Sequence, residues 1–275
     1  MGRVVRARAG ALALAAALAL ALAGAGAPAG AAQGGLDDGA LFPGWDGERG
    51  GRAGKVPREQ LRMLSWKPRV VEHRGFLIAA ECDAIIDAAK VLGDAVDEPE
   101  GAVLAPDDVS YAAQRALAHA DASAERTSMM PAQNAGVWRV RRLTHESAEE
   151  DAQLDTIAGL APGKRLPPGG QVAGVVVVFL SDAPLGGGGE QVFPDADLSA
   201  SSWERDKGLR WSKCATRGSP LAVSPRKGDA LLSWALDNAL REETRASRKA
   251  CPPADGEVWI ATKVMYTNSL LEGSA

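Results

Sequence analysis

The stretch VSPRKGDALLSWALDNALREETRASRKACPPADGEVWIATKVM, residues 223–265, decides the fold of this chain. It contains two apolar segments, GDALLSWAL and GEVWIATKVM, whose composition is typical of β-strands. A long charged loop that ends in Cys251-Pro252 connects them. We therefore expect two strands of one domain here, connected by that loop.

Further strands and two helices are expected upstream of this stretch. Residues 170–182, GQVAGVVVVFLSD, are β-branched and almost continuously apolar, so we expect a strand buried on both faces. Shorter strands are expected within residues 64–77, 136–143 and 219–225. Apolar residues recur at helical spacing in residues 79–92, and a second, short helix is expected within residues 106–120. Many short strands after N-terminal helices predict an antiparallel sandwich or a jelly roll.

The composition is that of a globular protein without a concentrated basic region. The chain has 275 residues, enough for one sizeable domain plus extra segments, and its formal net charge is -4. Arginines and lysines are scattered or lie next to acidic residues, which argues against a nucleic-acid partner.

The N-terminus has the pattern of a secretory signal. Three arginines precede an Ala/Leu run over residues 11–23, and small-x-small sites follow this run. We expect residues 1–27 to be a signal peptide or, alternatively, an uncleaved signal anchor, which is the only route by which this chain would reach a membrane. Residues 28–55 are rich in Gly, Ala and Pro and are expected to form a disordered linker before a domain over residues 56–270.

The three cysteines are Cys82, Cys214 and Cys251. An odd number in a secretory chain suggests one disulfide and one free thiol. Cys82 lies on the apolar face of the helix expected over residues 79–92, so we expect it to be packed rather than reactive.

Four segments in the same order resemble the prolyl 4-hydroxylase family of iron(II)/2-oxoglutarate dioxygenases, in its plant and algal secretory form. They are LSWKPRVVEHRGFLIAAECDAII (residues 64–86), ERTS (125–128), QVAGVVVVFLSDAPLGGGGEQVFP (171–194) and the opening stretch. The resemblance implies a mainly β fold with N-terminal helices, the double-stranded β-helix or jelly roll. It also implies hydroxylation of peptidyl proline with Fe(II), 2-oxoglutarate and ascorbate, a Pro-rich peptide or protein as partner, and residence in the endoplasmic reticulum lumen or membrane.

The family pattern holds iron with two His and one carboxylate, in H-x-D and H-x-x-C-P, and pairs a Lys with the distal carboxylate of 2-oxoglutarate. In this sequence H-x-D falls on residues 153–155, where Gln153 replaces the His and Asp155 is the only metal ligand kept. Arg248 occupies the second His position, three residues before Cys251, and Val258 occupies the cosubstrate Lys position. Leu143 stands where the family has a Tyr. Relatives from the secretory pathway often carry Cys at both 214 and 251, which implies a disulfide between them.

These replacements predict a damaged site. The guanidinium of Arg248 would repel a dication and has no lone pair to donate, so we hypothesise that an Arg248–Asp155 ion pair replaces the metal. Val258 leaves the 2-oxoglutarate carboxylate without a charge partner. Lys263 is no substitute, because a strand of period two directs it to the opposite face from Val258.

Three readings of function remain open at this point. The chain is a catalytically impaired homologue that retains a groove for Pro-rich peptides, an active dioxygenase whose ligands are misaligned or whose gene model is damaged over residues 129–156, or a non-catalytic structural or partner subunit. His145 and the acidic residues that follow it would offer a cation site, although such charge runs are usually solvated surface loops.

Overall fold

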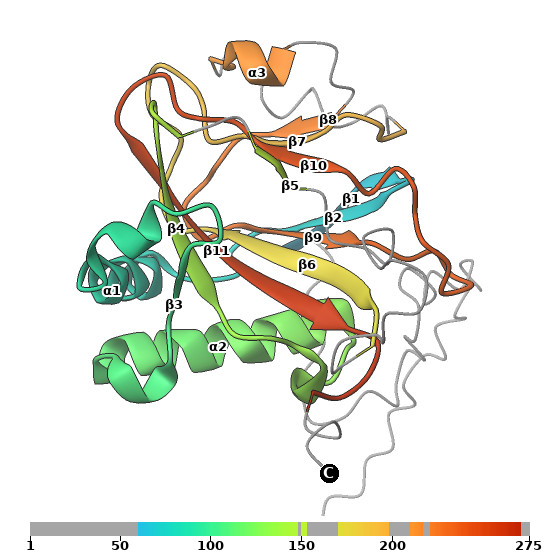
Figure 1. The fold of residues 1–275 in the computed structure, drawn as a ribbon, viewed down its shortest axis with the longest axis horizontal. Helices are drawn as coiled ribbons and strands as arrows, with labels where there is room; N and C mark the ends of the chain where they lie inside the picture. The colour runs from blue at the N-terminus through green and yellow to red at the C-terminus, as the bar shows by residue number, and fades with distance from the viewer. Residues whose placement is uncertain (1–59, 148–149, 153–169, 198–209, 217–220, 271–275) are drawn as a thin grey trace, which may run out of the picture. The chain divides into compact units, whose positions relative to one another are not determined.

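The protein folds into two antiparallel β-sheets that enclose one apolar interior, with two helices covering the outer face of the larger sheet (Figure 1). The computed structural model describes residues 60–147, 150–152, 170–197, 210–216 and 221–270, all within one compact unit, Gly39–Ala275. The expected signal, residues 1–27, and the expected linker, residues 28–55, lie outside the described residues. No helix among the described residues has the length and hydrophobicity that a membrane crossing requires.

The larger sheet has seven strands in the spatial order β1-β2-β9-β6-β11-β4-β3. Their bounds are Leu61–Trp66 (β1), Arg69–His73 (β2), Ala102–Val103 (β3), Arg139–Thr144 (β4), Val172–Phe179 (β6), Ala230–Trp234 (β9) and Glu257–Tyr266 (β11). The smaller sheet has the order β5-β10-β7-β8, with bounds Glu150–Ala152 (β5), Gln191–Phe193 (β7), Leu221–Val223 (β8) and Arg248–Ala250 (β10). This arrangement is the expected jelly roll.

Side chains from both sheets meet between them. The interior cluster is contributed by strands of the larger sheet (Leu64, Val70, Leu143, Val175, Val177, Phe179, Leu231, Val258, Ile260) and of the smaller sheet (Phe193, Leu221, Val223, Ala250). Because side chains alternate along a strand, the next residues on β11, Trp259 and Ala261, face the helices instead. The interior of the jelly roll is therefore mainly a packed apolar core, and buried polar side chains enter it from Arg141, Gln191 and Arg248.

Helices α1 (Ala79–Lys90) and α2 (Tyr111–Ser128) cover the outer face of the larger sheet. α1 begins where the Glu81 carboxylate accepts a hydrogen bond from the Ile78 amide at 3.0 Å. α2 begins at Ser110, whose hydroxyl accepts from the Ala113 amide, and ends at Met129 in the left-handed conformation. The remaining short helices are η3 (Gly93–Val96), η4 (Pro106–Asp108), η5 (Ala132–Asn134) and α3 (Lys213–Thr216).

Most of the expected elements are present, but the second helix and the number of strands differ. The acidic run after His145 was expected to be a surface loop and contains the short strand β5, and β3 was not expected. β6 is buried on both faces, and α1 matches the expected helix. The second helix is longer than expected, because its buried face continues through Ala124 and Thr127 to the end of ERTS. The loop between β9 and β11 contains an additional strand, β10, which pairs with β5 on one side and β7 on the other.

Candidate functional site

Arg248 lies in β10 on the inner face of the smaller sheet, two residues from the interior Ala250. Its side chain is buried, and its Nη1 donates a hydrogen bond to Oε1 of Gln191, which is fully buried in β7. The backbone of Arg248 is in register with Ala152 of β5. The second predicted His position therefore holds a guanidinium that is already engaged with a neighbouring strand.

Val258 lies in β11, is fully buried, and belongs to the interior cluster. Its cross-strand partner on β4 is Leu143, the residue at the predicted Tyr position. On the other side, a Cβ on Gly189 would lie 2.7 Å from the Val258 side chain, so the backbone of the glycine-rich turn approaches closely. The predicted cosubstrate position is thus buried, apolar and closely packed.

Lys263 faces away from Val258, as predicted. Its Nζ pairs with Asp121 of α2 and lies 5.2 Å from the centre of the Trp138 ring. The Trp138 indole donates to the same Asp121 oxygen at 2.7 Å. Lys263 therefore ties the sheet to α2 and is not available to the interior.

The described residues at these positions do not fit Fe(II) and 2-oxoglutarate. A guanidinium offers a metal no lone pair, and a valine offers a carboxylate no donor. Among the residues that the structure describes, no three His, Cys, Asp or Glu side chains gather closely enough to hold a metal ion. Gln153 and Asp155 lie outside the described residues, so the Arg248–Asp155 pair stays a prediction.

His73 is a buried residue that takes part in packing and hydrogen bonding between β2 and α2. It is buried in β2, its Nδ1 lies 2.7 Å from the Thr127 hydroxyl, and its ring meets Phe76 edge to face. Thr127 donates its single hydroxyl proton to the Ser123 carbonyl at 2.8 Å, so it accepts from His73, whose Nδ1 carries the proton. Burial, followed by the charge of Arg126, lowers the pKa of His73 to about 4.

The other two histidines lie apart from the interior. His119 of α2 pairs with Glu81 of α1 at 2.8 Å. His145 is exposed, and its Nε2 lies 3.8 Å from a carboxylate oxygen of Glu146. The side chains of the acidic residues 149–151 are not described, so the cation site suggested around His145 stays untested.

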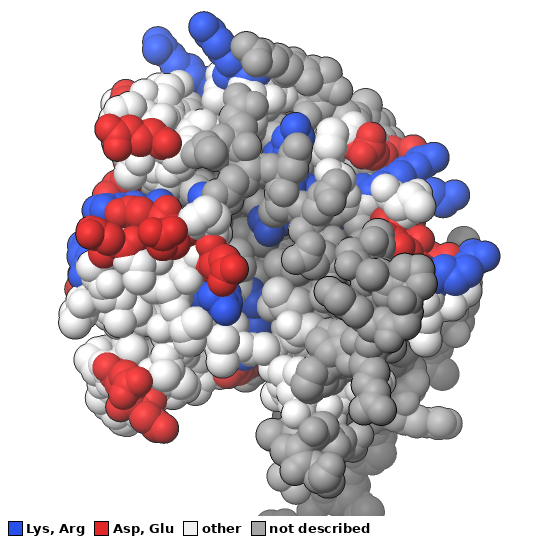
Figure 2. Space-filling view, in the orientation of Figure 1, with Lys and Arg blue, Asp and Glu red and all other residues white. Residues whose placement is uncertain are grey.

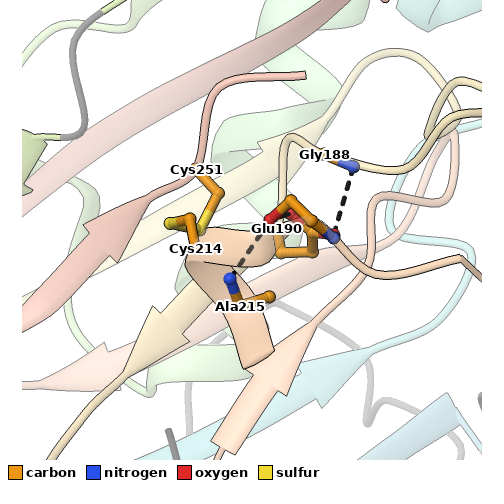
Figure 3. The surroundings of a disulfide bond; sticks show 6 residues. Gly188, Glu190, Cys214, Ala215 and Cys251 are labelled. Atoms are coloured by element: carbon orange, nitrogen blue, oxygen red, sulfur yellow. Dashed lines mark hydrogen bonds between the residues drawn. A yellow bond between two sulfur atoms is a disulfide. The ribbon is translucent and has the colours of Figure 1, made fainter. Parts of the chain in front are cut away.

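The predicted disulfide between Cys214 and Cys251 is present, with a Cα–Cα distance of 5.8 Å, and it joins α3 to the end of β10 (Figure 3). Cys82 is free and buried, and burial raises the pKa of its thiol to about 12. The expectation of one bridge and one packed thiol is therefore confirmed.

A buried carboxylate beside the disulfide was not anticipated from the sequence. Glu190 accepts a hydrogen bond from the Gly188 amide at 3.1 Å (Figure 3). It also accepts hydrogen bonds from the Ser212 amide and hydroxyl, both at 2.8 Å. Gly188 has φ +114, and a Cβ there would lie 2.2 Å from the Pro253 Cα. The glycines that precede Glu190 were its only sequence signal, and they indicated a turn.

Acidic and basic side chains are interspersed on the face shown in Figure 2, and acidic groups gather on the side of α1 and β3. Arg142 pairs there with Asp97 and Glu257, and Arg139 with Glu100. Exposed pairs of this kind contribute little to stability.

Comparisons with known proteins agree with this fold. No protein-family model matches the sequence. The chain is 30% identical over 227 residues to the Arabidopsis thaliana protein "Probable prolyl 4-hydroxylase 6", covering 78% of this chain and 74% of that one. It is 29% identical over 221 residues to "Prolyl 4-hydroxylase 2" of the same plant, covering 76% and 71%.

Among solved structures, a truncated form of the viral collagen prolyl hydroxylase from Paramecium bursaria Chlorella virus 1 superposes with a TM-score of 0.50 at 18% identity. The match covers 72% of this chain and 89% of the viral one, and at this identity it supports the fold alone. The sequence relationship to the plant proteins is closer, and it establishes that this chain belongs to the prolyl 4-hydroxylase family.

Proposed function

We propose that this chain is a prolyl 4-hydroxylase homologue that keeps the jelly roll but does not carry out iron(II)- and 2-oxoglutarate-dependent hydroxylation. The observation that supports this proposal is the buried apolar pair Val258 and Leu143 at the predicted cosubstrate position. Arg248 at a predicted iron position supports it independently.

The physical argument rests on the distal carboxylate of 2-oxoglutarate. At this position the carboxylate would lie against the hydrocarbon side chains of Val258 and Leu143, in the interior cluster. The buried Arg141, two residues from Leu143 on the same face of β4, already has an interaction of its own. Burying a carboxylate without a charged or hydrogen-bonding partner costs several kcal/mol. Cosubstrate binding is therefore unfavourable, and without it the family reaction has no oxidisable cosubstrate.

The retained activity in this proposal is binding of a Pro-rich peptide or protein. Two tryptophans outside the core favour such a ligand: Trp66 is 55% exposed at the end of β1, and Trp211 is half-buried. Pro-rich segments dock on aromatic surfaces in a preformed extended helix, which keeps the entropy cost of binding low. Trp234 and Trp259 are buried and contribute to packing instead.

We assign the protein to the secretory pathway, in the endoplasmic reticulum lumen, or on its membrane if the signal is retained as an anchor. Two observations support this assignment: the signal-like pattern of residues 1–27, and the Cys214–Cys251 disulfide, which an oxidising compartment maintains.

A turnover assay tests the loss of catalysis. The purified chain is incubated with Fe(II), 2-oxoglutarate, ascorbate, O₂ and a poly-proline peptide, with an active plant relative as positive control. We expect neither succinate nor hydroxyproline above the metal-free background. Turnover would refute the proposal and support an active dioxygenase with misaligned ligands, and a transcript covering residues 120–160 would then be checked for a missing His.

A binding assay tests the retained peptide site. Titration of the same poly-proline peptide is followed by tryptophan fluorescence, with Trp66→Ala as the matched variant. We expect saturable binding that Trp66→Ala weakens. Absence of binding to the folded protein would favour the alternative of a structural or partner subunit that does not bind peptide.

A further inference from the structure

Two polar side chains lie next to one another on the inner face of the smaller sheet, which is otherwise apolar in its described part. Arg248 comes from β10 and Gln191 from β7, adjacent strands in which Ala250 is in register with Gln191. Gln191 is therefore the diagonal neighbour of Arg248, a separation that long side chains can span. The hydrogen bond from Nη1 of Arg248 to Oε1 of Gln191 closes this gap.

The orientation of the Gln191 amide is determined by the arginine. With Oε1 directed to Arg248, the buried Nε2 of Gln191 has no hydrogen-bond partner among the described residues. Leaving a buried donor unpaired costs about 1–3 kcal/mol, so the contact with the guanidinium must offset that cost. Hydrogen bonds to charged groups are stronger than those between neutral groups, which explains why the oxygen takes this direction.

We propose that the Arg248 guanidinium is a resident cation of the jelly-roll interior, in the place where the family pattern puts a metal ion. It keeps its charge at every accessible pH, it links β10 to β7 through Gln191, and it repels a divalent cation at short range. The fold consequently neither binds a divalent metal at this position nor needs one for its stability. Metal binding at the Arg248 position is thus a separate question from catalytic turnover, which the proposed function addresses.

Metal binding is the first test, with Mn(II) as the probe because its electron paramagnetic resonance signal reports the free ion. We expect no stoichiometric Mn(II) binding to the full chain, and the same thermal unfolding midpoint in Mn(II), in Zn(II) and in EDTA. Binding of one Mn(II) per chain, with a midpoint that rises in Mn(II) and falls in EDTA, would overturn the inference. Such binding without turnover would leave the proposed function standing.

Substitutions on β10 are the second test. Arg248→Met removes the charge at similar volume, and Lys249→Met changes the next residue, whose side chain lies on the opposite face. We expect Arg248→Met to lower the unfolding midpoint by about 5 °C, because the Gln191 amide then loses its partner, and Lys249→Met to leave it nearly unchanged.

Equal midpoints for the two variants would show that the guanidinium does not hold the strands, and would refute the proposal. Gln191→Met is the second route if Arg248→Met does not fold, since it removes the acceptor and leaves the arginine in place. Its midpoint is expected to fall by a similar amount, and an unchanged midpoint in that variant would also count against the proposal.

Discussion

The buried histidine of β2 gives the most quantitative prediction. His73 has a pKa of about 4 in the folded protein, against an ordinary value of 6.5, because burial disfavours its charged form. Above pH 6.5 the imidazole is neutral in both the folded and the unfolded chain. Between pH 6.5 and about 4 only the unfolded chain binds the proton, so the free energy of unfolding falls as the pH falls.

The size of this loss follows from the two pKa values. Each pH unit between 6.5 and about 4 contributes about 1.36 kcal/mol, which gives a total of about 3 kcal/mol. His73 is only 4% exposed, so screening by solvent does not reduce this figure much. For a domain of ordinary stability, a loss of about 3 kcal/mol is a large fraction of the whole.

The variant His73→Asn isolates the effect, since an asparagine amide retains a donor toward Thr127 and does not titrate. Urea unfolding is measured from pH 7 to pH 4 for the wild type and for this variant. The difference in unfolding free energy between the two proteins is expected to shift by about 3 kcal/mol over that range, in the direction of wild-type loss. Parallel curves for the wild type and His73→Asn would refute the argument.

Three further predictions concern the site and its disulfide. Val258→Lys should lower the free energy of unfolding, measured by urea denaturation, by about 3–5 kcal/mol, because the lysine ammonium would be buried without a partner. A variant as stable as the wild type would show that the interior admits water or an anion. The double variant Cys214→Ser/Cys251→Ser should have a free energy of unfolding lower by about 4 kcal/mol, because the disulfide closes a loop with a separation of 37 residues. Denaturant unfolding under non-reducing conditions measures this difference, and a difference near zero would contradict the chain-entropy estimate. A double-mutant cycle of Arg248→Met and Asp155→Asn should give a coupling energy above about 1 kcal/mol if the two form the predicted ion pair, and a value near zero would rule the pair out.

Those parts of the fold that local pattern determines were predictable from the sequence. β6 follows from its continuous β-branched run, and the opposite orientations of Val258 and Lys263 follow from the period of a strand. β10 was not predictable, because Arg-Lys-Ala has no apolar pattern. It is a strand only because β5 and β7, distant in the sequence, supply ladders on both of its sides.

In the candidate site, too, some residues could be placed from the sequence and others could not. The family resemblance placed Arg248 and Val258 at ligand positions, and in the structure Arg248 lies on the inner face of the smaller sheet and Val258 on that of the larger sheet. The role of Gln191 was not predictable, because its partner is 57 residues away in the sequence. Glu190 likewise meets Ser212 across 22 residues, and nothing near it in the sequence indicates a buried carboxylate.

The two faces of β11 have a consequence for how this protein family can change. One face carries Val258 and Ile260 into the interior, and the other carries Trp259 and Ala261 against the helices. A substitution on the inner face keeps the side chains that contact the helices, so the residues that line the interior can change separately from those that hold the helices in place. Residues on one face of β11 can therefore determine what the interior binds, while residues on the other face determine how the sheet packs against the helices.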